Sequence, residues 1–540
     1  MIEATWRQPR EFPSALAQTR TPAECLRDEI ASRPGRIAVV DGSTALTVEQ
    51  LGVECVRWQR RLVRAGVGRG AVVAVQLPNW WETVAVAFAA WGLGAVINLL
   101  TPIYRGRDLR VLFEMRAPGA VVVPAHYRGT DHAEMMRAVL ADCGIDAAVI
   151  EVRGEGAGAG ATPGTAPTAE DFEVRPVSPD DVCMLMYTSG TTGRPKGVLH
   201  TSRSLLVEAA SIAEVFGVSR GSIFMPSPLT HVTGLLYGVL MPVLAESGVV
   251  LLDRWDPEVA LSLIEEHRCG MTVAATPFLR GLTDAYRAAE RRCSLRSFVC
   301  GGADIPPSLI AEAEQVLGTR ISRTYGSTEF PTLCTVHPGS DPAVHAVTDG
   351  TPIGDAEARL VGGHREGAGE LEVSGPEMFA GYLDPSDNES AITPDGWFRT
   401  GDLARIDPGG NLTIVGRVKD LIIRGGENIS AKEVEDLLIQ FPAVQDVAIV
   451  GFPDDVLGER VCAVVVSDDD AFGLASLVGE LRDSGVAMQK LPEALMRVDR
   501  LPRTASGKVQ KFELRALVET GIAEGAVELR PGIGRPADRA

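Results

Sequence analysis

The sequence has no excess of positive charge and no paired cysteine motif. Its formal net charge is −19 at pH 7, from 52 Lys and Arg against 71 Asp and Glu. A protein that wraps nucleic acid or sits on anionic lipid needs net or clustered positive charge, so neither partner is expected. The nine cysteines are scattered without a C-x-x-C pair, which fits a reducing compartment and argues against a disulfide framework or a zinc site.

Long hydrophobic runs are also scarce. The opening residues, MIEATWRQPREFPSAL, mix charge, proline and polar side chains, so they contain no secretory signal and we expect a cytoplasmic protein. The most apolar segment, 83–100, is interrupted by Gly92, Gly94 and Asn98. These interruptions predict a helix, a turn and a strand in place of a membrane span.

The pattern along the chain predicts several domains. A chain of 540 residues exceeds what one hydrophobic core usually organises. Helix-like and strand-like pieces alternate up to residue 153 and again over 182–350, which predicts two α/β subdomains. The segment between them, RGEGAGAGATPGTAPT (153–168), is expected to be an exposed connection between these lobes.

The C-terminal part has a different pattern. Short alternating strands with glycine turns over 366–383 and 410–428 predict a smaller β-rich subdomain. Ser430 and Glu433 then have the spacing of a capping box at the start of an amphipathic helix. Strand-like and helical segments follow. We read them as a small α+β domain and a polar tail, and the predicted domains are 1–418, 419–523 and 524–540.

A loop of small and hydroxylated residues follows an apolar strand. The stretch MYTSGTTGRPKG (186–197) holds three glycines, three threonines, a serine and two basic residues, and its backbone N–H groups and hydroxyls suit phosphate oxygens. It is not a Walker A loop, because Pro195 precedes Lys196 and Gly197 replaces the magnesium-binding hydroxyl. An ordinary surface loop is the alternative.

The same stretch resembles the signature loop of the adenylate-forming superfamily. This superfamily contains acyl-CoA synthetases, adenylation domains of peptide synthetases and beetle luciferases. Six more motifs resemble the family in its order: MPSPLTHVTG (225–234), CGGADI (300–305), YGSTE (325–329), GWFRTGDLARID (396–407), GRVKDLIIRGGENI (416–429) and PRTASGKVQK (502–511). The resemblance covers nearly the whole chain. It implies a fold of class α/β, with a large N-terminal domain of two α/β subdomains plus a β-rich subdomain, and a small mobile α+β C-terminal domain.

The resemblance implies a reaction that begins with a carboxylate attacking the α-phosphorus of ATP. The site must then supply positive charge and donors where charge accumulates. Mg²⁺ would be held by Glu329 with Thr188, since oxygen ligands suit that cation. The residues that would bind ATP and AMP are Thr188, Ser189, Gly190, Thr191, Thr192, Gly193, Lys196, Gly301, Gly302, Ala303, Tyr325, Gly326, Thr328, Asp402, Arg417 and Lys508.

Catalytic roles are implied for Lys508, Thr328, Glu329 and His231. The lysine would bridge the substrate carboxylate and the phosphate during adenylation, and the histidine would gate the acyl pocket. Without the motif context, the alternative interpretations are a surface acid for Glu329, a solvated lysine for Lys508 and a core or capping histidine for His231. The family's C-terminal domain swings about a hinge, here Lys419, and would then bring Gly425, Gly426 and Glu427 to the site as the CoA channel.

Positions that match the family's acyl pocket are mostly small or apolar, and none is basic. We therefore expect an apolar monocarboxylic acid, because a second carboxylate buried there would be unpaired. The flanking residues are similar to those of medium-chain and alicyclic acyl-CoA synthetases. The pocket positions are His231, Leu235, Leu236, Tyr237, Ala275, Thr276, Gly301, Gly326, Phe330 and Pro331.

The predicted activity is that of an AMP-forming acid–thiol ligase with ATP, Mg²⁺ and CoA. No Ser-His-Asp or Cys-His arrangement is needed, because the acyl-adenylate is already activated and CoA supplies its own sulfur. Two alternatives stay open: transfer to a carrier-protein phosphopantetheine, and an enzyme that runs only one half-reaction. The sequence does not identify the acid or the pathway. It also leaves the oligomeric state open, including whether the protein forms a homodimer.

Overall fold

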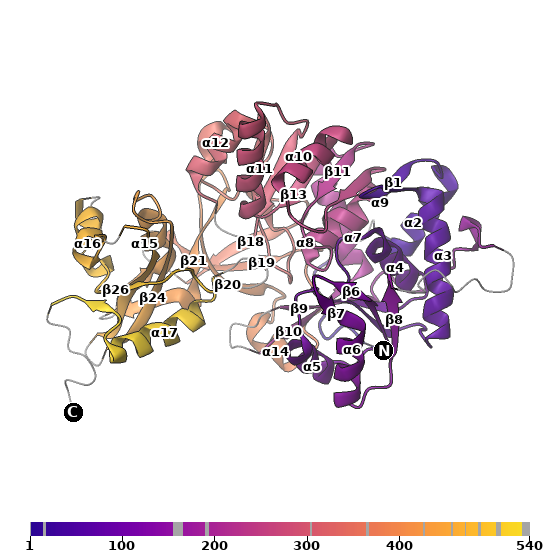
Figure 1. Cartoon of the computed structure of the whole chain (residues 1–540), viewed down its shortest axis with the longest axis horizontal. Helices are drawn as coiled ribbons and strands as arrows, with labels where there is room; N and C mark the ends of the chain where they lie inside the picture. Colours follow the sequence, from indigo (N-terminus) through magenta and orange to yellow (C-terminus); the bar gives the residue numbers. More distant parts are fainter. Residues whose placement is uncertain are drawn as a thin grey trace. The chain divides into compact units, whose positions relative to one another are not determined.

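The computed structural model describes residues 2–14, 18–154, 166–188, 194–302, 305–362, 367–424, 427–454, 457–469, 471–483, 488–503 and 509–531. The chain divides into two compact units. The first holds Met1–Ala358 and Val373–Phe398, and the second holds Arg359–Glu372 and Arg399–Ala540. Each unit is described separately (Figure 1).

The first unit contains two large sheets. The nine-stranded sheet has the order β17 (Thr351–Pro352), β16 (Cys334–Thr335), β15 (Arg320–Tyr325), β14 (Ser297–Gly301), β13 (Cys269–Ala274), β11 (Ser222–Met225), β12 (Gly248–Leu251), β1 (Ile37–Asp41), β2 (Thr44–Thr47). The six-stranded sheet has the order β10 (Lys196–Thr201), β9 (Val182–Thr188), β4 (Val96–Leu99), β3 (Val72–Val75), β5 (Ala120–Pro124), β8 (Ala148–Val152). The strands from β15 to β1 are parallel to one another, as are those from β9 to β8, so both sheets have buried, mostly apolar strands.

Helices lie between the two sheets and on their outer faces. Side chains that alternate along one strand enter different cores: Val39 and Val249 pack in the core shared with the six-stranded sheet, and Val40 and Val250 in the outer core of the nine-stranded sheet. The helices between the sheets are α2 (Pro22–Ser32), α3 (Val48–Arg64), α4 (Trp81–Gly92), α7 (Ser202–Val215), α8 (Val232–Leu235), the π-helix η2 (Leu236–Leu240) and α9 (Met241–Leu244). Outside the nine-stranded sheet lie α10 (Pro257–Glu266), α11 (Thr276–Ala289) and α12 (Pro307–Leu317), and outside the six-stranded sheet lie α5 (Gly106–Met115) and α6 (His132–Asp142) (Figure 1).

Smaller elements complete the first unit. They are the hairpin β6 (His126–Tyr127) and β7 (Thr130–Asp131), the 3₁₀ turn η1 (Ala169–Asp171), α13 (Pro342–His345) and α14 (Ser386–Ala391). The apolar segment 83–100 forms α4, a turn at Gly94 with φ of 70°, and β4, as predicted. No helix among the described residues is long and apolar enough to cross a membrane.

The two α/β subdomains are not consecutive in sequence, which corrects our division at 153–168. Strands β1 and β2 precede this segment but pair in the nine-stranded sheet, and β9 and β10 follow it but pair in the six-stranded sheet. The cause is the continuous apolar run of β9, which needs burial on both faces and finds it beside β4. Most of the segment, 155–165, lies outside the described residues.

The second unit holds the C-terminal sheet, as the α+β pattern predicted. Its order is β23 (Glu427–Ser430), β22 (Leu421–Arg424), β25 (Gly458–Val466), β26 (Ala494–Arg497), β27 (Glu528–Leu529), with β24 (Asp446–Asp454) paired to β25. One face packs on α15 (Ala431–Leu438) and α16 (Leu474–Asp483), and the other on α17 (Lys511–Glu524). Two 3₁₀ turns, η4 (Val418–Asp420) and η5 (Met488–Lys490), and a sheet of β18 (Glu357–Val361), β19 (Gly369–Ser374), β20 (Phe398–Ile406) and β21 (Leu412–Arg417) complete the elements.

Two local predictions for this unit have mixed outcomes. Ser430 caps α15 by accepting from the Glu433 backbone N–H, but the Glu433 side chain binds Lys490 in place of closing a capping box. The ordered chain also extends beyond the predicted start of the tail. Val527 is buried and β27 pairs with β26, so residues up to Leu529 belong to the folded unit.

Candidate active site

The predicted site residues of the first unit gather at one edge of the nine-stranded sheet. His231 follows β11, Ala275 and Thr276 follow β13, Gly301 ends β14 and Tyr325 ends β15. These four strands are parallel, so their carboxyl ends meet at the same edge. Ligands of open α/β sheets bind at this edge.

The phosphate-loop prediction falls on a hairpin. Strands β9 and β10 are antiparallel, and Thr188 lies opposite Lys196 in their register. The two predicted phosphate-binding residues therefore flank the same turn. The residues between them, 189–193, lie outside the described part of the chain.

Lys196 and Glu329 both contact the side chain of one tyrosine, Tyr382. The Lys196 ammonium is 4.7 Å from the centre of the Tyr382 ring and 3.2 Å from Asp387 Oδ1. The Tyr382 hydroxyl donates to Glu329 Oε1 at 2.9 Å. Burial, followed by the Glu329 charge, raises the pKa of Tyr382, so the hydroxyl keeps its proton and remains a donor to this carboxylate.

Backbone pairing places Tyr382 between these two groups. Ala380 N–H donates to Leu199 O and Leu383 N–H to Gly197 O, each at 2.7 Å, so this segment runs beside β10. Phe379 N–H donates to Glu329 O at 2.9 Å. The segment is thereby joined both to the hairpin and to the YGSTE turn.

A buried histidine fixes the residue before Glu329. His200 on β10 is fully buried, and its Nε2 lies 2.8 Å from the Thr328 carbonyl oxygen while its Nδ1 lies 3.0 Å from Ser204 Oγ. A carbonyl only accepts, so Nε2 carries the proton. Burial lowers the pKa of His200 to about 4, which keeps the ring neutral at pH 7.

Close backbone approaches explain two glycines among the predicted ATP- and AMP-binding residues. A Cβ on Gly326 would lie 1.9 Å from Pro331 O, and one on Gly301 would lie 2.6 Å from Thr324 O. Gly302 has φ of 81° but open space around it. The turn after β15 therefore excludes any side chain at position 326, whereas Gly302 is favoured only by its left-handed backbone.

Several predicted acyl-pocket residues are buried. Leu235, Leu236, Tyr237 and Phe330 are at most 4% exposed, and His231, at the N-cap of α8, is half-buried, as are Ala275, Thr276 and Pro331. The Tyr237 hydroxyl donates to Glu208 Oε1 at 2.6 Å and lies 2.6 Å from Thr332 Oγ1. These positions thus lie next to a buried carboxyl group.

This carboxyl group has a second acid as its neighbour. Burial raises the pKa of Glu208 to about 7, and burial together with the Glu208 charge raises the pKa of Glu377 to about 8. Ser211 Oγ lies 3.4 Å from Glu377 Oε1, and Oε2 of each acid is buried without a hydrogen-bond partner. The pair holds at least one proton near pH 7.

The second unit brings together two of the predicted ATP- and AMP-binding residues. Asp402 on β20 and Arg417 on β21 lie opposite each other, with Arg417 Nε 2.8 Å from Asp402 Oδ1. Lys419, the predicted hinge, lies in η4 and its carbonyl accepts from Arg515 at 3.1 Å. Burial, then the Arg417 charge, lowers the pKa of Lys419.

The remaining predicted residues cannot be placed. Ala303, Gly425, Gly426 and Lys508 lie outside the described residues, and only the backbone of Glu427 is described, at the start of β23. Their assignments stay predictions.

Four residues that lie around the site were not predicted from the sequence. They are His200, Glu208, Tyr382 and Asp387. The alternation of a strand gives one usable signal, since it places Lys196 and His200 on the same face of β10. Nothing local points to Tyr382, whose partner Glu329 is 53 residues away in sequence.

Comparison with known proteins agrees with this geometry. The model of the AMP-binding enzyme family matches residues 26–383, and the model of the AMP-binding enzyme C-terminal domain matches residues 433–508. The chain belongs to the AMP-binding enzyme family. The predicted membership of the adenylate-forming superfamily is confirmed, and the protein is an AMP-forming ligase of the acyl-CoA synthetase type.

Individual relatives span nearly the whole chain. The medium-chain fatty-acid–CoA ligase of Escherichia coli (strain K12) is 32% identical over 92% of this chain and 90% of its own length. A salicylyl-CoA synthase / salicylate adenylyltransferase of a Streptomyces species is 34% identical over 89% and 91%. The crystal structure of ATP-bound MatB from Rhodopseudomonas palustris superposes with a TM-score of 0.82 at 26% identity, over 92% of this chain and 98% of that one. The predicted α/β fold is confirmed by this likeness.

Proposed function

We propose that the protein activates an apolar monocarboxylic acid with ATP and then transfers the acyl group to CoA. In the first step a carboxylate oxygen bonds to the α-phosphorus, the bond to the β-phosphate oxygen breaks and pyrophosphate leaves. In the second step the CoA sulfur bonds to the acyl carbon and AMP leaves, while the thiol proton passes to solvent or to AMP. The products are acyl-CoA and AMP.

The arrangement of Lys196, Tyr382 and Glu329 supports this reaction most directly. The Lys196 ammonium lies over the Tyr382 ring and the Glu329 carboxylate accepts from the hydroxyl of the same residue, beside the β9–β10 hairpin. Adenylation brings two anions together, so it needs a fixed positive group where phosphate charge accumulates. Lys196 is the candidate for this role, and it would exchange Asp387 for a phosphate oxygen.

The donor set at Glu329 fits a magnesium ion. Oε1 accepts from Tyr382, and Oε2 has no hydrogen-bond partner among the described residues, so one carboxylate oxygen is available. Mg²⁺ prefers such hard oxygen ligands. Glu329, with Thr188, would hold it, and a bound ion would neutralise phosphate charge.

The remaining roles follow the matched motifs. Thr328 would donate to the α-phosphate, and His200 would hold its backbone in place. Tyr325 with Gly301, Gly302, Ala303 and Gly326 would form the adenine slot. Asp402 would accept from the ribose hydroxyls with Arg417 beside it, while Lys508 would bridge carboxylate and phosphate.

The substrate class follows from what surrounds the proposed acyl pocket. The pocket positions are mostly apolar, and the acid behind Tyr237 would repel a second carboxylate. The relatives that act on a medium-chain fatty acid and on salicylate, by their names, agree with a monocarboxylic acid. All nine cysteines are free thiols, which suits a reducing compartment, and we place the enzyme in the cytoplasm.

An ATP–pyrophosphate exchange assay over a panel of straight-chain, alicyclic and aromatic acids tests the first step, and thioester detection with CoA tests the second. Both should occur with at least one apolar acid, and a dicarboxylic acid of equal length should fail. Exchange without thioester would identify a carrier protein as the acceptor. Thioester from supplied acyl-adenylate without exchange would identify a half-enzyme, and neither activity with any acid would refute the proposal.

A further inference from the structure

A cavity lies at the opposite edge of the nine-stranded sheet from the candidate active site. Its lining includes Ile37, Ser222 and Gly248, which begin β1, β11 and β12, and Arg268, which precedes β13. Because these strands are parallel, the cavity is at their amino ends. Its volume is about 480 Å³, which falls in the range of small-molecule sites.

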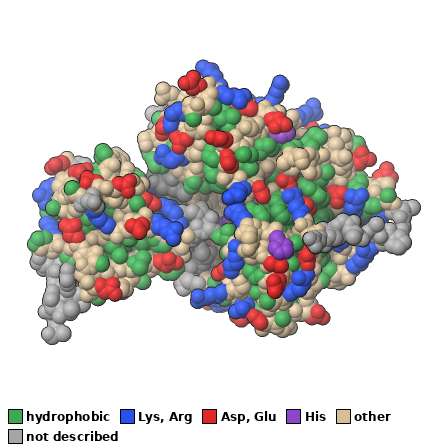
Figure 2. Space-filling model, in the orientation of Figure 1, with side chains coloured by type: hydrophobic (Ala, Val, Ile, Leu, Met, Phe, Trp, Pro, Cys, Tyr) green, Lys and Arg blue, Asp and Glu red, His purple; other side chains and the backbone are tan. Residues whose placement is uncertain are grey.

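Arginine dominates this cavity. Its lining holds four arginines, at positions 33, 36, 220 and 268, with His267 and a single carboxylate, Glu246. Such a concentration contrasts with the chain's net charge of −19. On the face drawn in Figure 2, acidic and basic side chains are interspersed. A guanidinium is a planar fork of donors that matches phosphate oxygens.

Some of these arginines have structural roles. Arg36 Nη2 is 2.8 Å from Glu29 Oε2 and Arg36 Nη1 donates to the Ser247 carbonyl, and Arg33 lies between Glu29 at 2.9 Å and Glu246 at 2.6 Å. These contacts lie where α2 ends and β12 begins. Arg33 and Arg36 are therefore held in place before any ligand binds.

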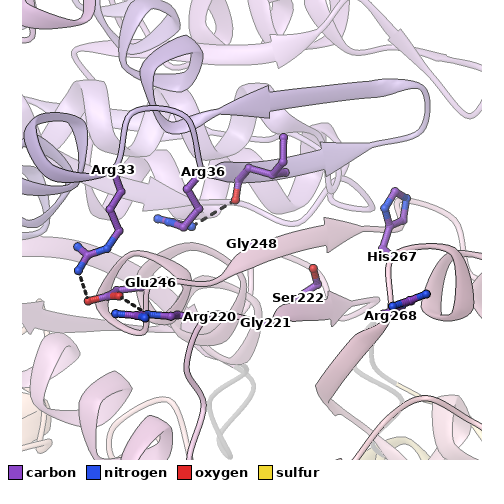
Figure 3. A pocket seen from close by; sticks show the side chains of 10 residues that line it. Arg33, Arg36, Arg220, Gly221, Ser222, Glu246, Gly248, His267 and Arg268 are labelled. Atoms are coloured by element: carbon purple, nitrogen blue, oxygen red, sulfur yellow. Dashed lines mark hydrogen bonds and ion pairs between the residues drawn. The ribbon is translucent and has the colours of Figure 1, made fainter.

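The other two arginines are available. Among the described residues the Arg220 guanidinium contacts only Glu246, with Nε 3.2 Å from Oε2, and its side chain is 78% exposed. The Arg268 guanidinium has no hydrogen-bond or ion-pair partner among the described residues. In Figure 3 the arginines at 33 and 220 lie with Glu246 at one end of the cavity, His267 and Arg268 lie at the other, and Ser222 lies between them.

The backbone at this cavity is unusual. Arg220, Glu246 and Arg268 have φ of 51°, 53° and 47°, a left-handed conformation that costs a residue with a side chain about 1 kcal/mol. Glycine would adopt it without this cost. Capping of the ends of α9 and α10 explains the conformation of Glu246 and Arg268, but it does not require a charged side chain at three such positions around one cavity.

We propose that this cavity is a binding site for a small anion that carries two phosphate groups. One phosphate group would lie between Arg33 and Arg220, displacing Glu246 from them, and the other would lie against Arg268 and His267. The Ser222 hydroxyl would donate between the two groups. The chemistry is shared by inorganic pyrophosphate and by organic bisphosphates.

Titration calorimetry with each ligand at constant ionic strength tests the site. The informative variant is Arg220→Gly/Arg268→Gly, because glycine removes both guanidiniums while relieving the left-handed backbone. Arg128→Gly is the matched control, since Arg128 also has a positive φ, 49°, and lies outside the cavity lining. Thermal unfolding of all three proteins checks that each is folded.

We expect Arg220→Gly/Arg268→Gly to bind pyrophosphate, fructose 1,6-bisphosphate or both about tenfold more weakly than Arg128→Gly does, or to lose one equivalent of binding. The loss of even one charge-assisted contact requires a change of this size. We expect pyrophosphate to bind the proposed active site as well. The pyrophosphate binding that is due to the cavity is therefore the part that is lost in Arg220→Gly/Arg268→Gly and kept in Arg128→Gly. Loss for pyrophosphate alone or for fructose 1,6-bisphosphate alone identifies the source. Unchanged affinity and stoichiometry for both ligands would overturn the proposal and leave the arginines as helix-end contacts.

Discussion

Tyr382 is the residue on which the orientation of Glu329 depends. Its hydroxyl is the donor to Oε1, and its ring is the surface that Lys196 contacts. The two functions can be separated by substitution, because phenylalanine keeps the ring and removes the donor.

We therefore expect Tyr382→Phe to weaken Mg²⁺-dependent exchange while leaving the fold intact. Loss of a hydrogen bond to a carboxylate costs about 1.5 to 3 kcal/mol, so the Mg²⁺ concentration for half-maximal exchange should rise about tenfold or more. Glu329→Gln should lower the exchange rate itself by about 100-fold. An unchanged Mg²⁺ dependence in Tyr382→Phe would contradict the role we give the hydroxyl.

His200 makes a prediction about pH. Its pKa is about 4 when folded against about 6.5 when unfolded, so the unfolded chain takes up the proton first as the pH falls. The stabilisation that neutral His200 provides is complete above pH 6.5 and is lost as the pH falls toward 4. Between pH 7 and pH 5 the free energy of unfolding should fall by about 2 kcal/mol more in the wild type than in His200→Gln, measured by urea denaturation.

The same histidine has a test in catalysis. Glutamine can still donate to the Thr328 carbonyl, whereas alanine cannot, so His200→Gln should keep most of the exchange activity at pH 8 and His200→Ala should lose about tenfold or more. Equal losses in both would show that the ring itself, and not its donor, is required.

At the scale of elements, the turn after β15 is the most constrained part of the site. The Gly326→Ala substitution would place a Cβ 1.9 Å from a backbone oxygen, which forces the turn to move. We expect it to lose more than 100-fold in exchange activity and to destabilise the protein by about 3 kcal/mol or more. Gly302→Ala is the control: its Cβ would meet nothing within 4 Å, so only the backbone cost of about 1 kcal/mol applies.

Glu208 on helix α7 should give the free energy of unfolding a pH dependence opposite to the one that His200 gives it. The folded pKa of Glu208, about 7, is above the ordinary value. The folded state is therefore more stable at low pH, where Glu208 is neutral, and this stability is lost as the pH rises through 7. Glu208→Gln should raise the free energy of unfolding by about 2 to 3 kcal/mol more at pH 8 than at pH 5. Glu214→Gln, exposed on the same helix, should show no such difference.

Local elements could be predicted from the sequence, and their pairing could not. Apolar runs and helical spacing predicted the alternation of helices and strands in the two α/β stretches and the helix that begins after Ser430, because these signals depend on neighbours in the chain. The exchange of β1 and β9 between the two sheets depends on pairing across long loops, and no local pattern records it. The contact between His200 and Thr328, which are 128 residues apart, could not be predicted from the sequence for the same reason.

At the scale of the whole molecule, the strongly negative chain binds a negatively charged nucleotide, so positive groups must be provided locally. Lys196 is our candidate for one such group on the first unit, and Arg417 is the candidate on the second. The motif resemblance adds Lys508, which belongs to the second unit in sequence. If Lys508 serves only the first half-reaction, as the motif resemblance implies, we expect the second half-reaction to proceed without it.

This separation makes a prediction for the two steps. Lys508→Ala should abolish ATP–pyrophosphate exchange, a loss of about 3 kcal/mol or more in transition-state stabilisation, and should largely spare thioester formation from preformed acyl-adenylate. Gly426→Trp should do the reverse, because it would obstruct the proposed CoA channel. Lys490→Ala, a lysine of the same unit that pairs with Glu433, should change neither step. Equal loss of both steps in Lys508→Ala would mean that the lysine is needed throughout, and the assignment of 419–523 as a domain that alternates between two positions would then be wrong.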